Sequence, residues 1–241
     1  MTLLTVIQAA CAEVGVSTPS SAIGNTDANV VQMLTLLNRE GKWLARGYDW
    51  QILRKEGSFS TLAANQQVAD LTSFTNVAAA SVTDLDRIVP KTMWDRTASE
   101  QIGEPLTAAR YQGDLANVTA GVRYRYIIRG NALFFSPVPP AGNSIYFEYF
   151  KKHWCASSGG TGKVAFTVDT DVGILDEDLL TQGLVVRFLK AKGLDYAEDF
   201  RRYEHLISVL TGQQSPAPDL SMTPPTAIDV TDPFVPDGSW S

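Results

Sequence analysis

The chain has 241 residues, of which 44% are hydrophobic and 19% charged, and this balance is typical of a protein that folds around one or two hydrophobic cores. Its net charge of −6 argues against a protein that wraps nucleic acid through a basic surface, and no apolar run approaches the length of a membrane-spanning helix. The only two cysteines, Cys11 and Cys155, suggest neither a disulfide framework nor a zinc site, which fits folding in a reducing cytoplasm.

Residues 1–48 are predicted to form two amphipathic helices. Apolar residues recur at helical spacing from Leu3 to Val14, before Gly15 and a Ser-rich loop end the segment. Thr26 or Asp27 then provides a cap for a longer helix that Gly47 ends.

Residues 49–156 predict an antiparallel β-rich insertion, because short β-branched and aromatic runs alternate with turn residues. Apolar and tyrosine residues alternate with arginines over 122–129, as on a half-exposed strand. The apolar and tyrosine positions are Val122, Tyr124, Tyr126 and Ile128, and the arginines are Arg123, Arg125 and Arg129. Gly130-Asn131 then predicts a hairpin turn, and another strand is expected from Ile145 to Lys151.

Residues 157–212 return to helical patterns. Asp176 is the expected cap of a helix that Gly193 breaks or kinks, and a second helical length runs from Tyr196 to Leu210. Since helices come from both ends of the chain, we expect an α+β fold in which a helical bundle carries an inserted antiparallel β-domain.

The C-terminal segment, residues 213–241, is predicted to be an extended docking arm. From Ser215 onward it has six prolines, four aspartates and no lysine or arginine, and proline disfavours helices and central strands. Apolar residues spaced along such a segment are what it needs to order itself on a partner. The expected anchors are Leu220, Met222, Ile228, Val230, Phe234, Val235 and Trp240.

An acidic run could attract a divalent cation, and a metal-dependent hydrolase using Asp169, Asp171 and Asp176 is the first alternative function. The spacing weakens it, because Ile174 and Leu180 stand where a calcium-binding loop needs glycine and glutamate. Turn formation and helix capping explain these aspartates better.

Two other sequence features suggest chemistry only weakly. The string SGGTGKV at 158–164 resembles a phosphate-binding loop, but Ser157 and Val164 stand where that motif needs a glycine and a hydroxyl. His153 and Cys155 could form a nucleophilic pair, but an exposed strand end at His153 is the simpler expectation. No catalytic, cofactor-binding or metal-binding residue is therefore assigned, and the chain is not expected to be an enzyme.

Four segments together resemble the head-to-tail adaptor proteins of tailed bacteriophages. They are LLTVIQAACAEVGVSTPSSAIGN, RIVPKTMWDRT, the hairpin ending FFSPVPPAG, and ILDEDLLTQGLVVRFLKAKGLDYAEDFRRYE. The resemblance implies a ring component, often a dodecamer, that binds beneath the portal protein and presents a surface to the next tail or nozzle protein. It also implies that the helical part contacts the portal and that the C-terminal extension reaches a portal subunit or a neighbouring copy.

The same resemblance implies a place in the neck or tail of the virion, after assembly in the cytoplasm of the bacterial host. DNA would pass through the ring without specific binding, and no membrane would be involved. Another structural phage protein, such as a tail-tube subunit, is the remaining alternative.

Overall fold

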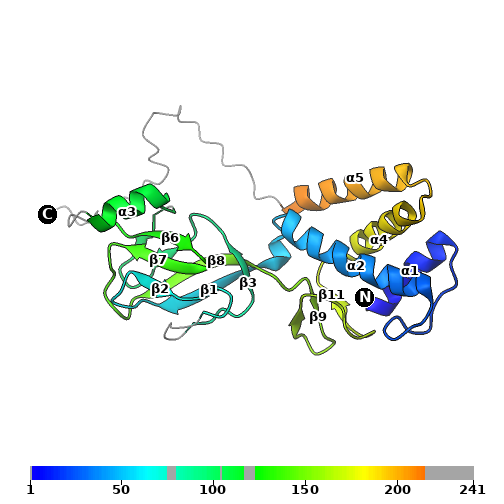
Figure 1. The fold of residues 1–241 in the computed structure, drawn as a ribbon, viewed down its shortest axis with the longest axis horizontal. Helices are drawn as coiled ribbons and strands as arrows, with labels where there is room; N and C mark the ends of the chain where they lie inside the picture. Colours follow the sequence, from blue (N-terminus) through cyan, green and yellow to red (C-terminus); the bar gives the residue numbers. More distant parts are fainter. Residues whose placement is uncertain (1, 75–79, 104, 117–122, 215–241) are drawn as a thin grey trace.

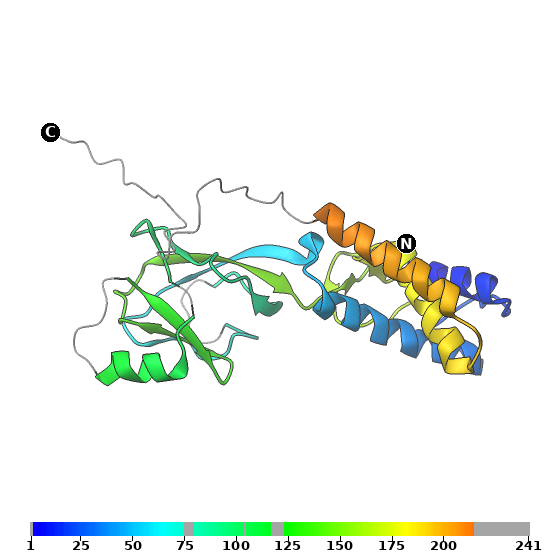
Figure 2. The same ribbon diagram turned by 90° about the horizontal axis from the view of Figure 1, so that it is seen from above.

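The computed structural model describes residues 2–74, 80–103, 105–116 and 123–214. Within them the expected α+β fold is confirmed: helices from both ends of the chain pack together, and antiparallel sheets lie between them in sequence. The two parts lie at opposite ends of an elongated molecule (Figures 1 and 2).

The helical part contains α1 (Leu3–Val14), α2 (Ala28–Gly47), α4 (Glu177–Lys192) and α5 (Ala197–Gln214). Their ends follow the expected capping chemistry: Asp27 accepts a hydrogen bond from the backbone N–H of Asn29, and Asp176 accepts one from Leu179. Gly15 and Gly193 end α1 and α4 in the left-handed conformation, with φ of 74° and 70°.

The apolar faces of these helices share one core. Fully buried contributors include Ile7, Met33, Leu37 and Leu184. A small sheet in the order β10 (Gly162–Lys163), β9 (Cys155–Ala156), β11 (Val172–Gly173) adds Cys155 to this core, next to the buried ring of Trp154. None of the helices in the described ranges is long and apolar enough to cross a membrane.

The larger sheet runs in the order β1 (Arg54–Ser60), β8 (Ser144–Lys151), β4 (Trp94–Asp95), β5 (Glu100–Gln101), with β3 (Leu85–Ile88) also paired to β8. A short 3-10 turn, Gln51–Leu53, connects α2 to β1. A second sheet runs in the order β2 (Gln66–Val68), β7 (Ala132–Ser136), β6 (Arg125–Arg129). Side chains from both sheets form a separate aromatic core that includes Phe59, Phe135 and Phe147.

The hairpin between β6 and β7 is confirmed, with Gly130 and Asn131 both at positive φ. The expected alternation on β6 is wrong at its end: Ile127 is buried, whereas Ile128 is 45% exposed. The reason is α3 (Ala108–Ala116), a helix that the sequence did not indicate, whose Tyr111 packs with Ile127 in a third small core.

Candidate functional site

The three aspartates of the alternative metal site each have their own structural partners. One carboxylate oxygen of Asp169 accepts hydrogen bonds from the backbone N–H groups of residues 22 and 23, at 3.1 and 2.8 Å. Asp171 forms an ion pair with Lys163, and Asp176 caps α4. In the part of the chain that the structure describes, no three His, Cys, Asp or Glu side chains are grouped so that they could hold a metal ion.

Asp171 holds a loop and the start of α1 in place. Its carboxylate is 1% exposed and accepts hydrogen bonds from Lys163 Nζ and from the backbone N–H groups of Thr167 and Val168. Its own carbonyl accepts a hydrogen bond from the backbone N–H of Leu3 at 2.7 Å. Burial raises the pKa of Asp171, but the hydrogen bonds and the lysine charge outweigh it and hold this pKa below its usual value.

His153 and Cys155 do not form a catalytic pair in this arrangement. The thiol of Cys155 is buried and donates to the backbone carbonyl of Lys163, and burial raises its pKa to about 12. His153 is only 22% exposed, so the expectation of an exposed strand end is wrong. Its Nδ1 lies 3.8 Å from a carboxylate oxygen of Asp84, whose other oxygen accepts a hydrogen bond from the Tyr149 hydroxyl at 2.6 Å.

The helices also bury a charged group that the sequence did not single out. Glu40 of α2 is 1% exposed, and its carboxylate contacts the guanidinium of Arg187 on α4 and the hydroxyl of Tyr203 on α5. Burial lowers the pKa of Arg187 and raises that of Tyr203. This network joins three helices, and its residues line a surface groove.

That groove, here called the helix groove, has a volume of about 970 Å³ and lies between α2 and the turn that connects α4 to α5. Its rim exposes large apolar side chains: Trp43 is 45% exposed, Leu194 52% and Phe200 41%. Exposed apolar clusters of this kind mark protein-contact surfaces more often than sites of chemistry.

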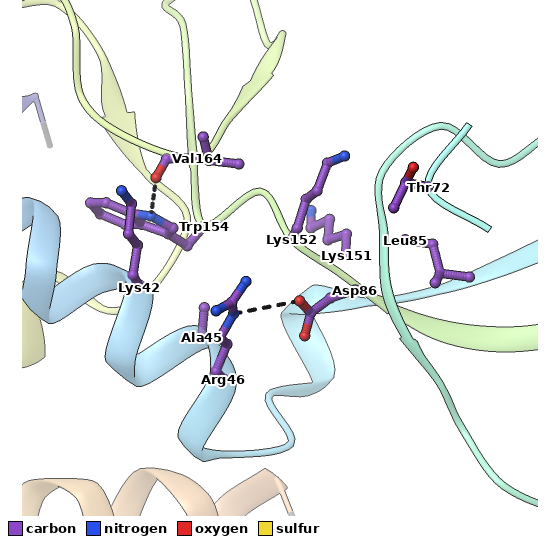
Figure 3. Close-up of a pocket in the computed structure, with 10 residues that line it drawn as sticks. All are labelled: Lys42, Ala45, Arg46, Thr72, Leu85, Asp86, Lys151, Lys152, Trp154 and Val164. Carbon is purple, nitrogen blue, oxygen red and sulfur yellow. Dashed lines mark hydrogen bonds and ion pairs between the residues drawn. The ribbon is translucent and has the colours of Figure 1, made fainter. Parts of the chain in front are cut away.

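A second groove, here called the basic groove, lies where the helical part meets the sheets and has a volume of about 450 Å³ (Figure 3). Lys42 and Arg46 reach it from α2, and Lys151 and Lys152 from the end of β8 and the residue after it. Its single lining carboxylate among the described residues, Asp86, lies 3.6 Å from Arg46. The lining also includes the buried apolar side chains of Ala45, Leu85 and Trp154.

Sequence reasoning missed the basic groove because Lys42 and Lys152 are more than a hundred residues apart in the chain. The adjacent Lys151-Lys152 pair was a visible signal, but only the fold brings α2 beside it. The predicted arm anchors all lie outside the described residues. They are Leu220, Met222, Ile228, Val230, Phe234, Val235 and Trp240.

Comparison with known proteins gives one family match. The model of a family described as SU10 adaptor protein matches residues 1–221, a range that contains every helix and strand described above. No curated protein sequence matches the chain.

Proposed function

This chain belongs to the SU10 adaptor protein family and is a phage head-to-tail adaptor, and from this premise we propose that it forms a ring beneath the portal protein. In this proposal the ring links the portal to the next tail or nozzle protein and leaves a channel through which DNA passes without specific binding. The family match over residues 1–221 is the observation that carries it, and it favours an adaptor over a tail-tube subunit. We propose a dodecamer, assembled in the host cytoplasm and placed at the virion neck.

The surface of the folded part supports a structural role. The helix groove presents Trp43, Leu194 and Phe200 to solvent, and aromatic side chains of this kind dominate the energy of protein interfaces. The hydrolase alternative draws no support from Asp169, Asp171 or Asp176, because each is already engaged in backbone hydrogen bonds, an ion pair or a helix cap.

The C-terminal arm is the proposed docking element. Its proline content favours an extended path, and its apolar residues supply anchors for pockets on a portal subunit or a neighbouring copy. A segment that orders only on its partner lets the protein stay soluble before assembly and still bind firmly in the ring. Repetition around the ring raises the effective concentration of each anchor.

Removing the arm tests this proposal. A chain that ends at Gln214 should unfold at the same temperature as the full chain, because it keeps every residue of the buried cores that the structure describes. It should no longer add a ring at the portal vertex when mixed with portal-containing heads, as seen by electron microscopy. Unchanged attachment of the shortened chain would refute the docking role.

A finer comparison separates the apolar anchors from the charges. Phe234→Ala with Trp240→Ala should weaken attachment by about tenfold or more, because buried aromatic anchors are typical interface hot spots. The matched control, Asp229→Ala with Asp232→Ala, removes two charges and should cost less, since a single solvent-accessible ion pair contributes about 0–1 kcal/mol. A larger loss of attachment from the aspartate substitutions than from the aromatic ones would show that the aromatic residues are not the anchors.

A further inference from the structure

Acidic and basic groups are unevenly divided between the arm and the folded part of this chain. Residues 215–241 carry four aspartates, Asp219, Asp229, Asp232 and Asp237, and no lysine or arginine. A segment of this composition has no positive group of its own with which to pair, so its charges are available to a basic partner.

The basic groove offers complementary groups. Lys42, Lys151 and Lys152 converge on one concavity, and among the described residues none of the three forms an ion pair. The apolar side chains of Ala45 and Leu85 line the same concavity. The groove thus combines positive charge with apolar lining residues, as the arm combines carboxylates with apolar side chains.

We infer that the basic groove of one copy binds aspartates of the C-terminal segment, residues 215–241, of an adjacent copy. This inference rests on the proposed ring and names the surface that receives part of the arm. The aspartates would lie against Lys42, Lys151 and Lys152, while the aromatic anchors remain available for other pockets.

The position of α5 favours an adjacent copy over the same chain. Tyr203 of α5 meets α2 at Glu40, whereas Lys42 follows Glu40 by two residues and so lies about 200° around the helix axis. The basic groove and α5 therefore lie on opposite faces of α2, and Figure 3 shows Lys42 beside the Trp154 ring. An arm that follows α5 would have to pass around α2 to reach the basic groove of its own chain.

Double-stranded DNA is the other polyanion that passes through the proposed ring. The observations favour the arm over DNA, because the chain as a whole carries a net charge of −6 and the groove is a concavity of only about 450 Å³ that includes the carboxylate of Asp86. DNA binding proteins neutralise several phosphates along an extended basic surface.

Disulfide trapping between two full-length chains tests the inference. One chain carries Lys152→Cys and the other Asp229→Cys, and the two are mixed on portal-containing heads under mild oxidation. The native thiols of Cys11 and Cys155 are fully buried and do not compete. We expect a disulfide-linked dimer on a non-reducing gel only when both variants are present. Arg129→Cys, on β6 of the second sheet and outside the basic groove, replaces Lys152→Cys as the control and should give no dimer.

Charge reversal provides a second readout. Changing Lys42, Lys151 and Lys152 together to Glu should lower attachment of the ring by about tenfold, because like charges would then face one another across the contact. Changing the four aspartates of the arm to Lys in the same chain should restore it. The matched control changes three exposed arginines to Glu, Arg110, Arg123 and Arg129, and should leave attachment unchanged.

Three outcomes would overturn the inference. The first is an internal disulfide in a chain that carries both cysteines, without any dimer, which would place the arm on its own groove. The second is that changing Lys42, Lys151 and Lys152 to Glu weakens binding of the full chain to duplex DNA but leaves attachment of the ring unchanged. The third is absence of both dimer and rescue; if deletion of the arm still abolished attachment, the proposed function would stand and only the groove would be wrong.

Discussion

Gly41 occupies the point where α2 passes over the indole ring of Trp154. A Cβ atom added at Gly41 would lie 2.4 Å from three atoms of that ring. The ring has little freedom to move, because it is fully buried, donates a hydrogen bond to the carbonyl of Val164 and packs edge-on against Phe166 at 4.8 Å between centroids. Only glycine allows α2 to approach this closely.

We therefore predict that Gly41→Ala lowers the free energy of unfolding by about 1–3 kcal/mol, the usual cost of overpacking a tight core. Gly47→Ala, at the end of the same helix, is the matched control, since nothing lies within 4 Å of its added Cβ and alanine favours the helix. Urea denaturation of the two variants measures both effects. An equal gain in stability for both would mean that Trp154 can move aside.

At the level of elements, the loop between β10 and β11 positions the first helix through Asp171. The Asp171 side chain forms an ion pair with Lys163, and its backbone carbonyl accepts a hydrogen bond from the N–H of Leu3 at the start of α1. Because the pKa of Asp171 is held below its usual value of 3.8, the stability it contributes is present above pH 3.8 and is lost as the pH falls through the lowered pKa.

Asp171→Asn should consequently lower the free energy of unfolding at pH 7 by about 3 kcal/mol, the lower end of the cost of breaking a buried ion pair. The difference from the unchanged protein should begin to shrink as the pH falls below 3.8, where the carboxylate of the unfolded chain takes up a proton while the native one is still charged. Denaturation at several pH values measures it. Asp176→Asn is the control, because asparagine caps helices as well as aspartate does. If it lowered the free energy of unfolding as much as Asp171→Asn does, the stabilising role given to the Asp171 carboxylate would be wrong.

Local signals in the sequence were sufficient for most elements. The caps at Asp27 and Asp176, the glycine that ends α1 and the Gly130-Asn131 hairpin depend on neighbours a few residues away, and the structure confirms each. The helix α3 was missed because its buried face within the described residues is a single tyrosine, Tyr111, which gives no helical periodicity.

Contacts between distant segments could not be read in the same way. The pairing of β1 with β8 and the meeting of Lys42 with Lys152 both depend on how the sheets join the helical part. The burial of Ile127 in place of Ile128 has the same cause, because α3 covers a face of the hairpin that would otherwise be exposed. For this reason the arm could be proposed from sequence, but the groove proposed to receive it could not.

In the whole molecule, the helical core and the core between the sheets are separate clusters of buried residues. The chain passes between them after α2 and again after β8. Phe150 of β8 and Val89, which follows β3, pack against the helical core, and the junction also holds two ion pairs: Arg87 with Asp49 at 2.7 Å and Arg46 with Asp86 at 3.6 Å. Exposed ion pairs of this kind contribute about 0–1 kcal/mol each and couple the two cores weakly.

Calorimetry should therefore show two thermal transitions, one for each core. Leu184→Ala removes a fully buried side chain from the helical core, and Phe147→Ala removes one that is 1% exposed from the sheet core. Each change should cost about 2–5 kcal/mol through the cavity it leaves, and each should lower one transition while leaving the other in place. Such independence would let the proposed ring hold its helical part rigid while the sheets adjust to a second partner. A single transition that both substitutions lower would instead show that the junction joins the cores into one cooperative unit.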